Sequence, residues 1–352
     1  MVIEPTAALD RGSEDSGVAQ RAYEAASLYY LQGETMEVIA HHLGVSRSTV
    51  SRLLDRARRT GIVRIEVTPP GAGSMEARFG AMFGVRAQIV PVREGSTEIH
   101  RLRQVAGVAA ARMVELIEAL EPQGQERGDR GDRGDKGGRL VGVAWGTTMS
   151  QVADALSARP IPELTVVQLN GATDPVLGPG AGEVLSRIGE SLGARVVAFP
   201  VPAFFDHVET REAMWSERSV RRVLELVSGV RLAVFGVGSL EGSLPSQVYE
   251  GGHLSSADRA MLRREGVVGD VCTVLLRADG SWRDIALNAR ATGPTPAQLA
   301  RIPRRLCVAG PAKASALLAA LRARVVTDLV VDDATARAVL DLVGPGARHE
   351  RL

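Results

Sequence analysis

The stretch "AHHLGVSRSTVSRLLDRARRTGIVRIEV", residues 40–67, decides how the amino-terminal part of this chain folds. Residues 46–64 carry six arginines and one aspartate, whereas the whole chain of 352 residues has a formal net charge of only +1. No global charge therefore draws the molecule to nucleic acid or to a membrane. The positive charge of this stretch is local and needs a local explanation.

The spacing of small and apolar residues in this stretch predicts a helix-turn-helix. Thr35 and Ser46 can each accept a hydrogen bond in the first turn of a helix, so we expect helices over 36–42 and 46–58. Gly44 permits the left-handed backbone of a tight turn between them. The small Ala40 allows close approach, and apolar contacts come from Ile39, Leu43, Val45, Val50 and Leu53. A preceding helix over 18–31, which ends at Gly33, completes the expected module.

The second of these helices, the recognition helix, has one apolar and one basic face. At about 100° per residue, Val50, Leu53, Leu54 and Ala57 share the inward face. Arg52, near the amino end, can bridge O6 and N7 of guanine, and phosphates can be neutralised by Arg56, Arg58, Arg59 and Arg64. A solvated basic face is the alternative, but the complete motif favours DNA. The residues expected to contact DNA are Thr35, Arg47, Ser48, Thr49, Ser51, Arg52, Arg56 and Arg59.

The composition predicts several segments along the chain. Residues 1–16 are expected to be a disordered tail, and residues 17–67 the helix-turn-helix domain, in which 62–67 could form a wing strand. Two prolines and two glycines make residues 68–74 a linker. A larger domain follows over 75–345, interrupted at 121–139 by five acids and five bases without a bulky apolar residue, which predicts a disordered surface insertion.

The larger domain alternates apolar strands with helical intervals, which predicts an α/β fold with a mostly parallel sheet covered on both faces. The expected strands are 87–92, 139–145, 164–170, 194–201, 231–238, 305–310 and 328–332. The expected helices are 98–120, 148–157, 181–192, 217–227, 256–265, 312–322 and 333–342.

Ligands of open parallel sheets bind beyond the carboxyl ends of the strands, and this rule selects a few loops. Gly146, Thr147 and Thr148 follow one strand and open a helix, a corner that suits a phosphate or another anion, or that is simply a capped helix start. Other candidates are the hydroxyl-binding side chains Gln168 and Asn170, the flexible Gly236 and Gly238, Asp270 at the start of an apolar strand, and Lys313 in a first helical turn. For Asp270 a turn cap, and for Lys313 a solvated side chain, are the alternatives.

Other classes of protein find little support in the sequence. No apolar run is long enough to span a bilayer and no signal peptide opens the chain, so a cytoplasmic location is expected. Cys272 and Cys307 lie in apolar runs and are expected to be buried free thiols. Scattered histidines predict no metal site. No P-loop, nucleophile elbow or dinucleotide fingerprint predicts a cofactor.

Several motifs together resemble the SorC family of sugar-binding transcriptional regulators, which is related to the wider DeoR group. The resemblance runs over about residues 18–342 and is carried by the helix-turn-helix stretch and by "VGVAWGTT", "QLNGATD", "GVVGDV", "AGPAKASALLAAL" and "LVVDDATARAVL". It implies a tetrameric repressor or activator that binds operator DNA. Its carboxy-terminal effector domain would resemble sugar-phosphate isomerases and bind a phosphorylated sugar or related carbohydrate.

The same resemblance implies roles for individual residues. Gly146, Thr147 and Thr148 resemble the phosphate loop, Gln168 and Asn170 hydroxyl-binding positions, and Asp270 and Lys313 further effector contacts. Two residues depart from the family pattern: Ala309 stands where a glycine is usual, and Val331 where a threonine is usual.

Two other functions compete with that of a regulator. A sugar-phosphate isomerase with an added DNA-binding module would need a general base, but Asp174, Asp270 and His207 form no recognisable catalytic set, so no enzyme is expected. A carbohydrate-sensing scaffold without DNA binding would leave the helix-turn-helix unexplained.

Overall fold

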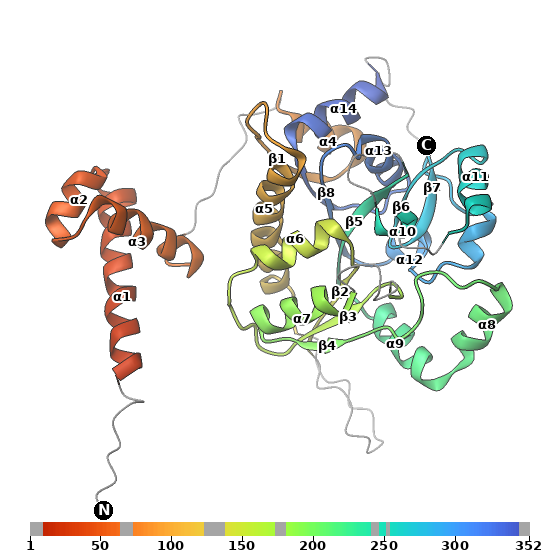
Figure 1. Ribbon diagram of the computed structural model, residues 1–352, viewed down its shortest axis with the longest axis horizontal. Coiled ribbons are helices and arrows are strands. Elements are labelled where there is room, and N and C mark those ends of the chain that lie inside the picture. The colour runs from red at the N-terminus through yellow and green to blue at the C-terminus, as the bar shows by residue number, and fades with distance from the viewer. Residues whose placement is uncertain are drawn as a thin grey trace, which may run out of the picture. The chain divides into compact units, whose positions relative to one another are not determined.

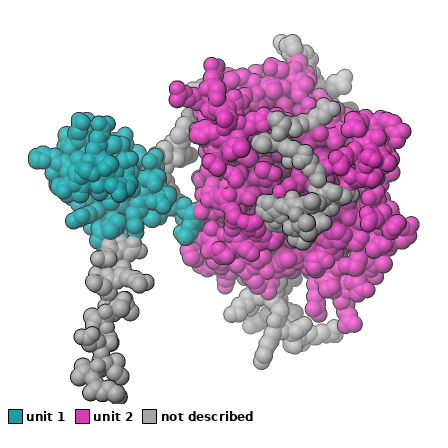
Figure 2. Space-filling view, viewed as in Figure 1, with its two compact units in different colours: residues 1–68, 157–159 teal, residues 69–156, 160–352 magenta. Residues whose placement is uncertain are grey.

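The computed structural model describes residues 10–63, 73–122, 138–172, 181–240, 246–250 and 254–344 (Figure 1). The chain forms two compact units, residues 1–68 with 157–159 and residues 69–156 with 160–352 (Figure 2). The division after residue 68 falls at the start of the predicted linker. Most of the predicted wing, linker and charged insertion, together with Arg64 and Asp174, lies outside the described residues.

The first unit contains the predicted helix-turn-helix. Its described elements are α1 (Asp10–Ala26), the π-helical turn η1 (Ser27–Leu31), α2 (Met36–Leu43) and α3 (Arg47–Arg59). Thr35 and Ser46 cap α2 and α3 as predicted, because their hydroxyl oxygens accept hydrogen bonds from the amides of Val38 and Thr49 at 3.3 and 3.2 Å. Gly44 makes the left-handed turn with φ of 61°. Buried side chains from all three helices pack into one small core, among them Ala22, Ala25, Ile39, Val50 and Leu54.

The amino-terminal helix begins earlier than the sequence predicts. Residues 10–16, expected to be disordered, belong to α1, and residues 1–9 lie outside the described part of the chain. Apolar periodicity marks only the packed part of a helix, here from Ala22 onward. Once that part has formed, each further residue adds a hydrogen bond without a new nucleation cost, so a polar segment can extend it.

Seven parallel strands form the main sheet of the second unit, in the order β1-β9-β8-β5-β2-β3-β4. The mostly parallel α/β prediction is therefore confirmed. The strands are β1 (Arg86–Val90), β2 (Arg139–Val143), β3 (Leu164–Gln168), β4 (Arg195–Val197), β5 (Leu232–Ser239), β8 (Arg304–Ala309) and β9 (Asp328–Asp332). Each matches a predicted strand, although β4 is shorter than predicted.

Helices cover both faces of this sheet (Figure 1). One face packs against α5 (Glu98–Glu118), α6 (Thr147–Ala155) and α7 (Ala181–Leu192). The other packs against α4 (Met75–Phe83), α9 (Arg218–Ser228), α13 (Ala314–Arg322) and α14 (Asp333–Val343). Alternate residues of β5 point to the two faces: Leu232 and Val234 join one core, and Ala233 and Phe235 join the other. Strands buried on both faces read as continuous apolar runs, which is the pattern that the sequence shows.

Several short elements were not predicted. They are α8 (Val208–Ser216), α10 (Gln247–Glu250), α12 (Pro296–Leu299) and the short helix η2 (Ala286–Ala289), besides α4. The strands β6 (Val267–Val271) and β7 (Val274–Arg277) form a hairpin where a single strand starting at Asp270 was predicted. The predicted helix over 256–265 is α11 (Ser256–Arg264). Most of these segments are too short to carry a clear hydrophobic period.

The hairpin of β6 and β7 corrects the predicted position of Asp270. We expected Asp270 at the start of a strand, but it is the fourth residue of β6, which pairs antiparallel with both β5 and β7. The turn lies later, at Cys272 and Thr273, whose positive φ angles of 49° and 71° suit a tight hairpin turn. Gly269 lies within β6, where only a glycine fits, because a Cβ there would collide with the carbonyl of Gly238 on β5.

Candidate functional site

The first candidate site is the outward face of α3. Val50, Leu53, Leu54 and Ala57 are buried against the rest of the module, as predicted. Arg47, Ser48, Ser51, Arg52 and Arg59 are exposed, as is Thr35 at the start of α2. Thr49 and Arg56 are half-buried, so they offer less of their surface to a partner.

Local contacts hold two of the exposed arginines near the helix. Arg59 forms an ion pair with Asp55, with 2.9 Å between Nε and Oδ2, and Arg47 lies 3.5 Å from a carboxylate oxygen of Glu37. Both pairs are exposed, where such contacts contribute little to stability and exchange readily for phosphate. Arg52 donates from Nε to the carbonyl of Ser48 at 3.4 Å. The face is therefore basic, exposed and weakly self-paired.

The second candidate site is a cavity at the carboxyl ends of the strands in the second unit. The chain runs from β2 through β3 to β4 in one direction along the sheet, and from β5 through β8 to β9 in the other. The cavity lies where these directions diverge, between β2 and β5, which is where open α/β sheets bind ligands. It holds about 450 Å³ of space not filled by atoms, part of it open to solvent.

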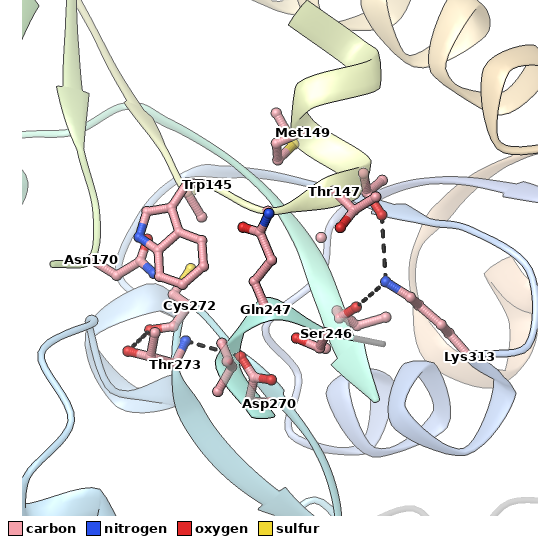
Figure 3. A pocket seen from close by; sticks show the side chains of 17 residues that line it. Trp145, Thr147, Met149, Asn170, Ser246, Gln247, Asp270, Cys272, Thr273 and Lys313 are labelled. Atoms are coloured by element: carbon pink, nitrogen blue, oxygen red, sulfur yellow. Dashed lines mark hydrogen bonds between the residues drawn. The ribbon is translucent and has the colours of Figure 1, made fainter. Parts of the chain in front are cut away.

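Eight of the nine residues predicted to contact an effector line this cavity (Figure 3). They are Gly146, Thr147, Thr148, Asn170, Gly236, Gly238, Asp270 and Lys313. These residues come from five separate segments of the chain, which the fold places around one cavity. They were selected because they lie near the carboxyl ends of strands. Figure 3 shows Thr147 and Lys313 on one side of the cavity and Trp145 and Asn170 on the other, with Asp270 between them.

The amino terminus of α6 forms one wall. Gly146 precedes the helix with φ of 139°, a conformation that favours glycine, and contributes no side-chain cap. The first amides of a helix have no intrahelical partner, so those of residues 147–149 remain available to a ligand. Together with the hydroxyls of Thr147 and Thr148 they form a corner with anion-binding character.

Lys313 lies at the same corner, immediately before α13. Its Nζ donates to the carbonyl of Val237 at 2.9 Å and contacts Oγ1 of Thr148 at 3.5 Å. Lys313 is buried, and burial lowers its pKa, although the nearby Asp270 opposes this effect. The alternative of a solvated lysine is therefore wrong. On its other side, the contact between Thr148 and Lys313 borders a smaller hollow lined by Leu102, Gly310 and Pro311.

Asp270 is a buried carboxylate with an unused acceptor. Its Oδ2 accepts a hydrogen bond from the amide of Thr273 at 3.0 Å, whereas Oδ1 has no hydrogen-bond partner among the described residues. Burial raises its pKa to about 6, against the opposing effects of Tyr249, the Thr273 amide and Lys313. Gly238 is required opposite it, because a Cβ there would overlap Oδ1. Asp270 therefore caps the hairpin turn, as in the alternative interpretation, but only through Oδ2, and Oδ1 remains available to a ligand.

Asn170 and Gln168, predicted as a pair, differ in the structure. Asn170 lines the cavity, and its buried Oδ1 has no hydrogen-bond partner among the described residues. Gln168 does not line it: its amide donates to the carbonyl of Asn170 at 2.6 Å and accepts from the amide of Phe199 at 3.1 Å. Both ends of the Gln168 amide thus serve the backbone, and its position corrects the expectation that it contacts a ligand.

The cavity also contains side chains that the sequence did not single out. Trp145 presents its ring and donates from Nε1 to the carbonyl of Gly171. Ser246 and Gln247 enter from the start of α10, and Thr273 from the hairpin turn. Trp145 adjoins the recognised Gly-Thr-Thr loop, a signal that could have found it. Ser246, Gln247 and Thr273 belong to elements without a clear sequence pattern.

Most of the other predicted features lie apart from this cavity. Ala309 and Val331, the two departures from the family pattern, are buried in β8 and β9 and do not line it. Cys272 and Cys307 are buried free thiols, as predicted, and Cys272 reaches the cavity. His207 is exposed before α8. The described residues contain no group of three potential metal ligands and no helix able to cross a membrane.

Two protein families match separate parts of the chain. The family described as "Putative sugar-binding domain" matches residues 132–341. Region 4 of sigma-70, a DNA-binding region, matches residues 20–60, which include α2 and α3. The matches therefore cover the cavity and the basic helix respectively.

Relatives align along nearly the whole chain. The deoxyribonucleoside regulator of Bacillus subtilis (strain 168) is 28% identical over 332 residues, which is 92% of this chain and 97% of that protein. The transcriptional regulator LsrR of Enterobacter sp. (strain 638) is 29% identical over 323 residues, which is 90% of this chain and 91% of that protein.

Solved structures share the fold. A domain of a possible sugar-binding transcriptional regulator from Arthrobacter aurescens TC1 is 38% identical with a TM-score of 0.65, and the match covers 78% of this chain and all of that one. The full-length sorbitol operon regulator SorC from Klebsiella pneumoniae, 23% identical, has a TM-score of 0.67 over 91% of this chain and 98% of that one. At that identity the second likeness concerns the fold alone.

Proposed function

This chain belongs to the sugar-binding-domain family of transcriptional regulators, and we propose that a phosphorylated sugar in the cavity controls how tightly its helix-turn-helix binds operator DNA. The observation that carries this proposal is the division of one cavity into an anion-binding end and a hydroxyl-binding end. A phosphorylated sugar offers both kinds of group on one small molecule.

The anion-binding end favours a phosphate over an uncharged group. Free amides at the start of α6 and the ammonium group of Lys313 converge there with two threonine hydroxyls. Phosphate accepts several hydrogen bonds at once and is stabilised by the positive end of the helix dipole. A buried lysine also gains most from a dianion, because its charge is otherwise poorly compensated.

The hydroxyl-binding end favours a polyhydroxylated ligand. Buried acceptors that lack partners cost free energy, and Oδ1 of Asn170 and Oδ1 of Asp270 are two such atoms in the described part of the cavity. Sugar hydroxyls would satisfy both. The ring of Trp145 supplies an apolar surface beside them, as aromatic side chains do in many small-molecule sites.

We extend the proposal to a homo-oligomer in which two recognition helices bind paired half-sites. Ligand would favour one arrangement of the subunits and so change the spacing of the helices, with the coupling free energy set by the difference in its affinity for the two arrangements. On the DNA side, contacts are proposed for Arg47, Ser48, Ser51, Arg52 and Arg59, with smaller contributions from Thr35, Thr49 and Arg56.

A thermal-shift screen tests the effector proposal. Sugar phosphates and their unphosphorylated parents are added in parallel to the full-length protein, because a ligand that binds only the native state raises its melting temperature. We expect at least one sugar phosphate to raise Tm by several degrees more than its parent sugar. Equal shifts from both, or a shift only from free sugars, would refute the phosphate assignment. Assay of the same mixtures for isomerised product checks for enzymatic turnover.

A further inference from the structure

The described part of the cavity has few charged side chains, and its positive and negative charges lie at different places. Among the described residues that line it, Lys313 is the one cation and Asp270 the one carboxylate. The described part of the cavity can therefore compensate one anionic group of a ligand, through Lys313 beside the start of α6.

Asp270 is held in place with one acceptor unused. Lys313 and the Tyr249 hydroxyl favour its charged form, but its Oδ1 has no hydrogen-bond partner in the described part of the chain. The amide of Thr273 holds Oδ2, and the pairing of Asp270 with Gly238 fixes the backbone beneath it. Oδ1 occupies space that a Cβ at residue 238 would fill, so this position of the carboxylate requires Gly238. A fixed acceptor with negative charge thus faces the ligand at the hydroxyl-binding end of the cavity.

We propose that Asp270 selects ligands that carry a single phosphate. One phosphate binds at the start of α6 and Lys313, and a hydroxyl in the rest of the ligand donates to Oδ1 of Asp270. A second phosphate placed beside Asp270 would meet a fixed carboxylate and, among the described lining residues, no cation other than Lys313. This inference rests on the proposed function, because it names the class of sugar phosphate that the same cavity takes.

Like charges explain the strength of this selection. A phosphate monoester is mostly dianionic at pH 7 and then offers oxygen acceptors without a donor, so it is a poor replacement for the hydroxyl as a partner for Oδ1. Placing it against a buried carboxylate adds repulsion where screening by solvent is weak. Specificity of this kind comes from a repulsive element rather than from tighter binding of the favoured ligand.

Matched pairs of ligands test the inference on the full-length protein. Fructose 6-phosphate is compared with fructose 1,6-bisphosphate, and ribose 5-phosphate with ribulose 1,5-bisphosphate, by isothermal titration calorimetry. In whichever pair binds, we expect the monophosphate to bind at least about tenfold more tightly. Asp270→Asn keeps the size of the side chain and removes its charge, and should narrow that ratio to within about threefold. Asp284→Asn, a change at an exposed carboxylate, serves as the matched control and should leave the ratio unchanged.

The outcomes separate this inference from the proposed function. Equal affinity for the two members of a pair, or full discrimination in Asp270→Asn, would overturn the role of Asp270 while leaving a sugar-phosphate effector in place. Failure of every monophosphate and bisphosphate to bind the wild-type protein would overturn both proposals together. The comparison of two ligands on the wild-type protein keeps the test valid even if Asp270→Asn does not fold.

Discussion

Single residues in this chain were predictable where a local rule fixed their role. Thr35, Gly44 and Ser46 have the capping and turn positions that their side chains favour, and the strand-end rule selected Thr148 and Lys313. Gln168 was predicted to bind a ligand hydroxyl but does not line the cavity. A sequence shows which side chain follows a strand, but not which partner that side chain will contact. The Gln168 amide is used up by the backbone of Asn170 and Phe199, a contact that only the fold creates.

Arg52→Ala tests the assignment of a base-reading residue on α3. We expect it to cost roughly 1–3 kcal/mol of binding to an operator selected from random-sequence DNA, because a bidentate contact with guanine would be lost. Affinity for unrelated DNA should change little. The measurement is a fluorescence anisotropy titration with both DNAs.

Arg58→Ala is the matched control for that prediction, since Arg58 is exposed on the same helix and its sequence position favours a phosphate rather than a base as its partner. It should weaken binding to both DNAs alike and reduce the salt slope by about 1. Full operator affinity in Arg52→Ala, or an equal loss on both DNAs, would remove Arg52 as a reader of sequence.

Whole elements were predictable in proportion to their length and burial. The central strands β5 and β9 are apolar runs buried almost throughout, which made them easy to predict. The edge strands β1 and β4 are largely exposed and carry polar residues such as Arg86, Gln88 and Arg195, yet each was also found. The β6–β7 hairpin was not found. Its turn consists of Cys272 and Thr273, which are not typical turn residues, and Gly269 is a strand residue that lets β6 approach β5 closely.

The β6 strand also sets a pH dependence, because it buries the carboxylate of Asp270. The pKa of Asp270 is raised from 3.8 to about 6, mainly by burial, so the folded state binds more protons than the unfolded state between these values. Stability therefore falls as the pH rises through this window and stays lower above it. Tyr249 on α10, Cys272 and Thr273 in the hairpin turn, and Lys313 before α13 are the groups that face the carboxylate.

Asp270→Asn should accordingly stabilise the ligand-free protein at pH 7 by up to about 3 kcal/mol, with the gain fading as the pH falls from 6 to 4. Urea unfolding followed by tryptophan fluorescence measures this, since Trp145, Trp215 and Trp282 all lie in the second unit. Asp284→Asn should show no such trend. If the difference in unfolding free energy between Asp270→Asn and the wild type were the same at pH 4.5 and at pH 7, the raised pKa of Asp270 would be contradicted.

At the scale of the whole molecule, sequence and structure agree on two units with separate tasks. One presents a basic helix for DNA and the other a cavity for a small molecule, and the family of regulators unites both in one chain. What sequence could not supply is the charge layout of the cavity. That layout depends on side chains from β2, β5, β6 and α13, which are up to 168 residues apart between Trp145 and Lys313.

The central claim is that the cavity controls DNA binding, and one measurement tests it most directly. Operator affinity of the full-length protein is measured with and without a saturating sugar phosphate, for the wild type and for the variant that combines Thr147→Val with Lys313→Ala. We predict that the ligand changes wild-type affinity by about tenfold or more. The double variant should bind operator normally and show no response. Two results would contradict the account. In the first, the sugar phosphate changes operator affinity equally in the double variant and the wild type. In the second, the wild type binds both the sugar phosphate and the operator, but the sugar phosphate does not change its operator affinity.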